Sequence, residues 1–247
     1  MIVAGYDNRI ANSQQQKPAF EKVYLNVRQH EQRMISDDEL THLPDIDPSH
    51  IHSKEWHVRK RSMQKLVAYL QKKKKLLNIL EIGCGNGWLA SKLADIPGSK
   101  VIGLDINREE IKQAKRVFKK NNLEFTSNCF KPDMFIGEKF DIILFAASIP
   151  YFGNLKSIIS DALSCLSETG EIHIVDTHFY KQEDIDNAVN RMEKYYEEMG
   201  YPEMSGHYYH HSLKDMELFN YKLLTDPQSL FNRISKKEPF YWVVINH

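Results

Sequence analysis

Between residues 76 and 177, short apolar runs alternate with segments of helical periodicity, and this alternation limits the possible folds more than any other feature. The apolar runs, typical of buried strands, cover residues 76–82, 100–106, 123–128, 140–147 and 171–177. Helical segments lie at residues 88–96, 107–120 and 154–166, and a turn is expected at residues 168–170. This spacing predicts right-handed crossovers and a parallel sheet. We therefore predict a doubly wound α/β domain with helices on both faces of the sheet.

Polar residues at the starts of the helices predict their N-caps. Asn107 is expected to cap one helix, with Glu110 as its reciprocal partner, and Asn154 to cap the next. Ser53 is predicted to cap an earlier helix, which ends in the four lysines of residues 72–75. Cations at that end complement the helix dipole, so we interpret the lysine run as a solvated helix end rather than an RNA-binding patch.

The pattern is less regular on either side of this core. Residues 1–50 contain polar runs and little apolar surface, and only residues 19–34 have helical character. We predict that residues 1–50 form an extension that packs over the active site, the alternative being a partly disordered tail. Residues 51–247 form the main domain, with a His/Tyr-rich insert near residues 201–215 that follows a long helix. Two strand-like pieces flank a short helix near the carboxyl end.

Composition excludes several classes of protein. Lys plus Arg equals Asp plus Glu, at 33 each, so no field of the whole molecule attracts nucleic acid. The longest uncharged apolar stretch, residues 142–152, is too short to span a bilayer, and the amino terminus lacks a secretory pattern. Three widely spaced cysteines argue against a disulfide framework or a zinc site. We expect a cytoplasmic, reduced protein without a metal.

A glycine cluster and an acidic residue follow the first two predicted strands. Gly83, Gly85 and Gly87 let the backbone turn sharply and let a ligand approach the main chain closely. Asp105 ends the second strand, where a carboxylate can accept both hydroxyl groups of a ribose. Ligands of open parallel sheets lie at the carboxyl ends of the strands. The sequence therefore predicts a nucleotide-like ligand at this edge.

The glycine spacing separates the possible nucleotide ligands. A dinucleotide fingerprint requires a third glycine three residues after the second, where this chain has Trp88. No lysine and serine follow to make a phosphate loop. Glu81, two residues before the first glycine, suits a cation better than a pyrophosphate. The site is therefore predicted to bind an adenosine that carries a sulfonium and an ammonium group.

Four motifs in order, LEIGCGNGWLA, GLDIN, FDIILFAASIPYF and LSETGEIHIVD, resemble those of the class I S-adenosylmethionine-dependent methyltransferases. The resemblance is closest to the small-molecule group, including uncharacterised bacterial members, and covers about residues 76–177. It implies a Rossmann-like seven-stranded sheet, mostly parallel with an antiparallel last strand. It also implies S-adenosylmethionine as cofactor and S-adenosylhomocysteine as product.

The resemblance also implies which residues hold the cofactor. Glu81 and the glycine turn would hold the methionine part, Asp105 the ribose, and Ile106 would pack on the adenine. Asn128 stands where the family usually has an aspartate that accepts from the adenine amino group, and the backbone of Cys129 follows. The full predicted set is Glu81, Gly83, Cys84, Gly85, Asn86, Gly87, Asp105, Ile106, Asn128, Cys129, Ala146, Trp56 and Arg59.

Trp56 and Arg59 lie three residues apart, so they share one face of the helix before the first strand. In this superfamily the residues ahead of the domain often fold over the cofactor. Arg59 would then pair with its carboxylate while Trp56 closes over its methionine arm. The alternative is a surface arginine and a core tryptophan.

Two candidate catalytic residues lie near the ends of later strands. His178 follows the fifth strand, where it could act as a base for a hydroxyl or protonated amine acceptor, or face solvent. Tyr151 belongs to the same rim. Its segment Ser148-Ile-Pro-Tyr151 resembles the loop of amino-methylating enzymes, but the offset from Asp141 favours a simple pocket lining. The residues around His207 are expected to cover the substrate, the alternative being a metal site.

The acceptor class rests on the resemblance to the small-molecule group. We predict methyl transfer to an oxygen or nitrogen of a small soluble molecule, such as a sugar or a secondary metabolite. The alternatives are an RNA or protein methyltransferase that docks through the lysines of residues 72–75, and a non-catalytic S-adenosylmethionine-binding subunit. The oligomeric state has no sequence signal.

Overall fold

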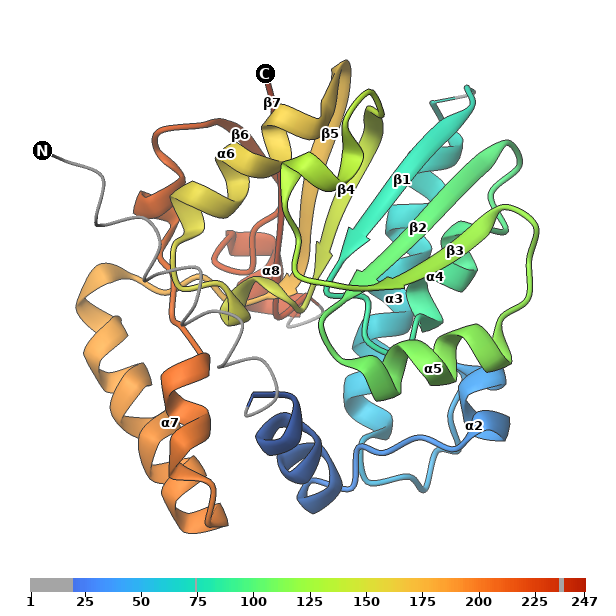
Figure 1. Ribbon diagram of the computed structural model, residues 1–247. Coiled ribbons are helices and arrows are strands. Elements are labelled where there is room, and N and C mark those ends of the chain that lie inside the picture. Colours follow the sequence, from blue (N-terminus) through green and yellow to red (C-terminus); the bar gives the residue numbers. More distant parts are fainter. Residues whose placement is uncertain (1–19, 74, 236–237) are drawn as a thin grey trace, which may run out of the picture.

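The computed structural model describes residues 20–73, 75–235 and 238–247, and its centre is one seven-stranded sheet (Figure 1). The strand order is β3-β2-β1-β4-β5-β7-β6. The five neighbouring strands β3, β2, β1, β4 and β5 run parallel, whereas β7 is antiparallel to both β5 and β6. The strands are β1 (Leu77–Ile82), β2 (Ser99–Asp105), β3 (Leu123–Ser127), β4 (Phe140–Ala146), β5 (Leu166–Thr177), β6 (Asn220–Thr225) and β7 (Tyr241–Asn246). The predicted doubly wound sheet with its antiparallel last strand is confirmed.

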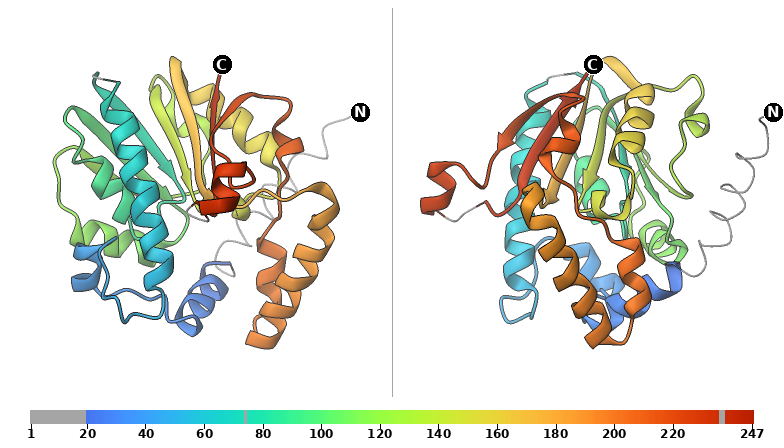
Figure 2. Two further views of the ribbon diagram at one scale, coloured as in Figure 1. Left: turned by 180° about the vertical axis from the view of Figure 1, so that it is seen from behind. Right: turned by 90° about the vertical axis from the view of Figure 1, so that its left-hand side faces the viewer.

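Helices cover both faces of the sheet, as predicted. One hydrophobic cluster packs α2 (Asp37–His42), α3 (Ser53–Gln71), α4 (Trp88–Leu93) and α5 (Arg108–Val117) against one face. A second cluster packs α6 (Leu155–Cys165) against the other face. Figure 2 shows α3 lying along the sheet. The carboxyl edge of the sheet, where the ligand is predicted to bind, is therefore held between two buried hydrophobic clusters.

The predicted helix caps are confirmed at two positions and wrong at a third. The side chain of Asn107 accepts hydrogen bonds from the backbone N–H groups of Glu109 and Glu110, and that of Asn154 accepts from Ser157. Helix α3 begins at Ser53 itself, and its N-cap is His52 without a side-chain bond. Ser53 lies one position too late to cap because residues 50–52 already form a turn.

The expected turn at residues 168–170 is instead an irregular part of strand β5. The register against β4 jumps from the pair Leu166–Phe140 to the pair Glu171–Ile142, so β5 carries extra residues there. A Cβ at Gly170 would lie 2.7 Å from Leu166 and 2.9 Å from the Phe140 carbonyl oxygen. Residues 168–170, which were expected to form a turn, therefore form a bulge within β5, because the chain stays close to β4 there.

A helix over residues 20–30 and helix α7 (Ile185–Met199) extend beyond the carboxyl edge of the sheet (Figures 1 and 2). Val23 and Val27 are buried between them in a third hydrophobic cluster with Tyr196 and Met204. This part of the predicted extension is therefore ordered by tertiary packing, whereas residues 1–19 lie outside the described residues. No helix in the described part of the chain is long and apolar enough to cross a membrane.

Candidate active site

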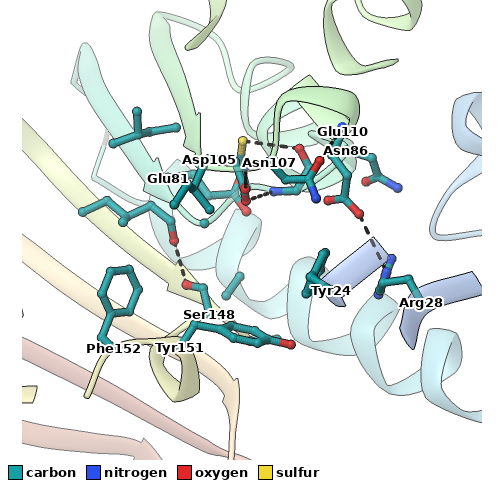
Figure 3. Close-up of a pocket in the computed structure, with 18 of the residues that line it drawn as sticks. Tyr24, Arg28, Glu81, Asn86, Asp105, Asn107, Glu110, Ser148, Tyr151 and Phe152 are labelled. Atoms are coloured by element: carbon teal, nitrogen blue, oxygen red, sulfur yellow. Dashed lines mark hydrogen bonds and ion pairs between the residues drawn. The ribbon is translucent and has the colours of Figure 1, made fainter. Parts of the chain in front are cut away.

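A cavity of about 520 Å³ opens at the carboxyl ends of β1, β2 and β4 (Figure 3). The predicted site residues that line it come from α3 and from the ends of four strands. They are Trp56, Arg59, Glu81, Gly83, Cys84, Gly85, Asn86, Asp105, Ile106, Asn128, Cys129, Ala146 and Tyr151. Gly87 lies behind this wall, where a Cβ would meet the Phe125 ring at 2.4 Å. The structure thus brings together residues spread over nearly 100 positions.

The glycine turn is clamped between β2 and β4. The backbone N–H of Gly83 donates to the Leu104 carbonyl at 2.7 Å, and that of Gly85 donates to Asp105 Oδ2 at 2.7 Å. Gly83 has φ +76°, and a Cβ there would lie 2.4 Å from Ser148 Cβ. The Ser148 hydroxyl in turn donates to the Ile82 carbonyl at 2.6 Å. This hydroxyl is therefore a structural link and does not face an acceptor as in the amino-methylating loop.

Asp105 ends β2 as a half-buried carboxylate that accepts hydrogen bonds from backbone N–H groups. Its Oδ1 accepts from the N–H of Asn107 and its Oδ2 from that of Gly85, both at 2.7 Å. Burial and the nearby charge of Glu110 raise the pKa of Asp105 to about 7, although the backbone donors oppose this rise. A carboxylate oxygen accepts more than one hydrogen bond, so both oxygens retain capacity for ligand hydroxyl groups.

Glu81 is only 2% exposed, and its Oε2 has no hydrogen-bond partner among the described residues. Burial, and then the charge of Asp105, raise its pKa well above the ordinary value. An unpartnered buried carboxylate oxygen is costly unless a ligand satisfies it. A cationic group in the cavity would supply that partner, so this donor set fits a ligand with an ammonium or sulfonium group.

The predicted adenine side lies at the ends of β2 and β3. Ile106, Asn128 and Cys129 line the cavity. The Oδ1 atom of Asn128 accepts from the backbone N–H of Cys129 at 2.9 Å, so the oxygen predicted to meet an adenine amino group also orders its own turn.

Trp56 and Arg59 line the cavity from α3. The guanidinium of Arg59 lies 5.5 Å from the centre of the Trp56 ring, and its Nε donates to Glu55 Oε1 at 3.0 Å. Trp56 packs edge-on against Trp88 at 5.3 Å. Trp56 therefore belongs to the core and to the cavity wall at once, so the two interpretations of this residue are not exclusive.

His178 does not lie where the sequence analysis put it. It is absent from the cavity lining, and its ring centre lies 4.7 Å from that of Phe240. The backbone is left-handed at Asp176, with φ +55°, and two residues later the His178 ring packs against Phe240 and Tyr180 instead of entering the cavity. Tyr151 does line the cavity, but burial raises its pKa, which disfavours the phenolate that a general base needs.

Many lining residues were not predicted as site residues, and three of them lie on the helix over residues 20–30. Phe20, Tyr24 and Arg28 recur every four residues and line the cavity on one face of that helix. Arg28 Nε lies 3.7 Å from Glu110 Oε1, so Glu110 faces the helix instead of closing the capping box. The i, i+4 spacing can be read from the sequence, but the sequence does not show that these side chains face the cavity.

The sequence of residues 73–229 matches the family described as methyltransferase domain. This chain belongs to that methyltransferase family. The predicted membership of the class I S-adenosylmethionine-dependent enzymes, with their cofactor, is therefore confirmed.

Curated relatives of this methyltransferase are similar over limited stretches. It is 30% identical over 101 residues to the ubiquinone biosynthesis O-methyltransferase of Pelagibacter ubique, covering 40% of this chain and 42% of that relative. It is 39% identical over 70 residues to a putative protein N5-glutamine methyltransferase of Methanocaldococcus jannaschii, covering 28% of this chain and 34% of that one. The methyltransferase thus spans less than half the length of these relatives.

Solved structures share the fold of this methyltransferase. The plantazolicin methyltransferase BpumL has a TM-score of 0.54 at 17% identity and covers 95% of this chain and 98% of its own. The magnesium protoporphyrin IX methyltransferase of Synechocystis PCC 6803 has a TM-score of 0.53 at 16% identity, with coverage of 81% and 88%.

Proposed function

We propose that this methyltransferase transfers a methyl group from S-adenosylmethionine to an oxygen or nitrogen of a small acceptor held in the cavity. The observation that carries the proposal is the pair of cavity-lining carboxylates, buried Glu81 and half-buried Asp105, on either side of the glycine turn. Asp105 would accept the ribose hydroxyl groups, and Glu81 would pair with the cationic methionine part. Ile106, Asn128, Cys129 and Ala146 would surround the adenosine.

The bound cofactor supplies an already activated methyl group, so the chain's own task is to position the reactants and exclude water. The helix over residues 20–30 covers the cavity with Phe20 and Tyr24, in support of an extension that packs over the site. We assign Tyr151 an orienting role through its hydroxyl group rather than the role of a base, because its raised pKa keeps the hydroxyl protonated.

The ion pairs of the lysine run favour a small acceptor over RNA. Lys73 Nζ lies 2.9 Å from Glu171 Oε2, and Lys75 Nζ lies 2.9 Å from Asp141 Oδ1. Lys74 lies outside the described residues. Lys75 and Asp141 stand beside the first residues of β1 and β4, at the edge opposite the cavity. Cations that are neutralised so far from the site are poorly placed to guide a nucleic acid into it.

Calorimetry with S-adenosylhomocysteine, NAD and the Asp105→Ala variant tests the proposed cofactor site. We expect micromolar binding of S-adenosylhomocysteine, which corresponds to about −8 kcal/mol, and no binding of NAD. The variant should lose roughly 1.5 to 3 kcal/mol of the binding free energy, because hydrogen bonds to a charged group disappear. Binding of NAD, or an unchanged affinity in the variant, would contradict this assignment. Retained binding without transfer to any acceptor would favour the non-catalytic subunit.

A further inference from the structure

Two groups of residues line the cavity, a charged half and an aromatic half, and they meet where Arg28 lies beside Tyr24 (Figure 3). The charged lining residues all precede β3 in the chain: Arg28, Arg33, Glu55, Arg59, Glu81, Asp105 and Glu110. From Phe130 to Tyr209, no lining residue among the described ones carries a carboxylate, ammonium or guanidinium group. With the cofactor placed at Glu81 and Asp105, the uncharged half is the space left for the acceptor.

The aromatic half is built from three segments that are distant in the sequence. Phe20 and Tyr24 come from the helix over residues 20–30, Tyr151 follows β4, and His207 and Tyr209 come from the insert after α7. The Tyr151 ring lies edge-on at 6.0 Å from Phe20 and 5.7 Å from Tyr24, and Phe20 lies 5.0 Å from His207. These four rings therefore form one continuous wall, and Tyr209 lines the cavity beside Gly153.

These rings are not simply the interior of the neighbouring hydrophobic cluster. On the same helix, Val23 and Val27 are 5% and 4% exposed and supply that interior. Phe20 and Tyr24 pack against the edge of that cluster, remain only partly buried and line the cavity. The two valines thus anchor the helix, and the rings beside them are left partly exposed to a ligand.

Tyr209 is held at the cavity mouth by a specific backbone contact. Its N–H donates to the Pro150 carbonyl at 2.7 Å, and its ring lies so close to Gly153 that a Cβ there would meet the ring at 2.9 Å. The side chain is nevertheless 40% exposed. A large aromatic side chain that is both fixed and solvent-accessible is well placed to contact a ligand ring.

We propose that this aromatic half is the acceptor subsite and that it takes a planar, uncharged ring, aromatic or heteroaromatic, that bears the oxygen or nitrogen to be methylated. The inference rests on the proposed function. Ring faces and edges pack well against such an acceptor. The nearest charged group, the Arg28 guanidinium 5.8 Å from the centre of the Tyr24 ring, already lies opposite Glu110, so a charged acceptor would lose its hydration without gaining a free countercharge. A saturated sugar ring also packs on aromatic side chains through its C–H groups, but it gains no interaction between π-systems there. Among the small acceptors expected from the sequence, the proposed subsite therefore favours aromatic and heteroaromatic compounds.

The test compares 2-naphthol with decahydro-2-naphthol, which has the same hydroxyl group and carbon skeleton but no π-system. Binding of each compound is measured by calorimetry with and without saturating S-adenosylhomocysteine. We expect 2-naphthol to bind the loaded protein at least tenfold more tightly than the saturated compound. Equal affinity of the two compounds, or no binding of 2-naphthol, would overturn the subsite.

Variants at the rim localise the effect. Gly153→Ala should displace the Tyr209 ring, and Tyr209→Ala removes it, so each should weaken 2-naphthol binding about five- to tenfold without changing the affinity for S-adenosylhomocysteine. Gly206→Ala is the matched control, because a Cβ there meets nothing within 4 Å. Unchanged 2-naphthol binding in Tyr209→Ala would contradict the proposal even if Gly153→Ala does not fold.

The two proposals fail in different ways. Failure of S-adenosylhomocysteine to bind while 2-naphthol still binds would overturn the cofactor assignment and leave an aromatic ligand site. Binding of S-adenosylhomocysteine without any preference for 2-naphthol would leave the cofactor assignment intact and overturn the aromatic subsite.

Discussion

At the residue scale, this protein keeps two carboxylates in the cavity wall, one buried and one half-buried. Asp105 and Glu81 each have a raised pKa because burial disfavours the charged form. A structure would ordinarily avoid this cost by placing apolar residues there. Retaining both groups is reasonable if a ligand with hydroxyl groups and a cation compensates them, and this dependence on a ligand can be measured through pH.

The affinity for S-adenosylhomocysteine should rise with pH. The pKa of Asp105 in the free protein is about 7, and ribose hydroxyl groups bind the carboxylate form better than the neutral acid. Protonation therefore competes with the ligand, and binding at pH 6 should be about tenfold weaker than at pH 8. Calorimetry across this range checks the effect. Asp105→Asn is the control that should flatten the pH dependence around 7, and a flat wild-type profile would rule out the raised pKa.

At the scale of elements, the glycine turn links β1, β2 and β4, and Gly83 packs directly against Ser148. Gly83→Ala should destabilise the fold for two reasons, its φ of +76° and a Cβ only 2.4 Å from Ser148 Cβ. Gly137→Ala is a matched control, since Gly137 has φ +80° but nothing within 4 Å of its Cβ position. The control should lose about 1 kcal/mol of unfolding free energy, and Gly83→Ala clearly more. Equal losses in urea unfolding would mean that close packing at Ser148 is unimportant.

A second element-scale feature fastens α3 to β5 and β7. Trp242 Nε1 donates to His173 Nδ1 at 3.0 Å, so the His173 proton is on Nε2, which donates to Glu171 at 3.1 Å. Tyr69 and Lys73 of this region also bind the Glu171 carboxylate. Burial alone would raise the pKa of Glu171, but the hydrogen bonds and charges of His173 and Lys73 outweigh it and lower the pKa to about 2.

This network should contribute to stability above pH 4.5 and lose its contribution in acid. The folded-state pKa of Glu171 lies below its unfolded value, so protonation between pH 4.5 and 2 favours unfolding by up to about 3 kcal/mol. Glu171→Gln should therefore be less stable at pH 7 and show a shallower loss of stability over that range. Glu168→Gln serves as control, because Glu168 is exposed and lies three residues before Glu171 in the chain. Urea unfolding at several pH values checks this, and parallel profiles for wild type and Glu171→Gln would contradict it.

At the scale of the whole molecule, the helix over residues 20–30 contacts both the region of α7 and helix α5. Val23 and Val27 attach it to the region of α7, and Arg28 reaches Glu110 on α5. The cavity lies beneath this connection. A cofactor that contacts both sides should therefore stabilise the helix as well as the domain.

Saturation with S-adenosylhomocysteine at 100 times its dissociation constant should stabilise the protein by about 2.7 kcal/mol, which raises Tm by roughly 5 to 10 °C. Hydrogen exchange should slow in residues 20–30, which line the cavity, and stay unchanged in β6 at the far edge of the sheet. Unchanged exchange in the helix would mean that it does not cover the bound ligand.

The sequence by itself determined the features that depend on neighbouring residues. The alternation of strands and helices, the caps Asn107 and Asn154, and the glycine turn with Asp105 could all be predicted, because hydrophobic period, capping and backbone freedom are local properties. The antiparallel last strand and the cofactor came from the resemblance of four motifs. Together these define the fold and the residues that we propose for the cofactor.

Only the tertiary structure decided what meets across long stretches of chain. The pairing of Glu110 with Arg28, the bulge in β5 and the position of His178 away from the cavity all depend on elements that approach in space. The aromatic half of the cavity is the clearest case, since Tyr24, Tyr151 and Tyr209 share no local pattern. Burial and contact between distant segments set the acceptor side, and one-dimensional periodicity carries no information about either.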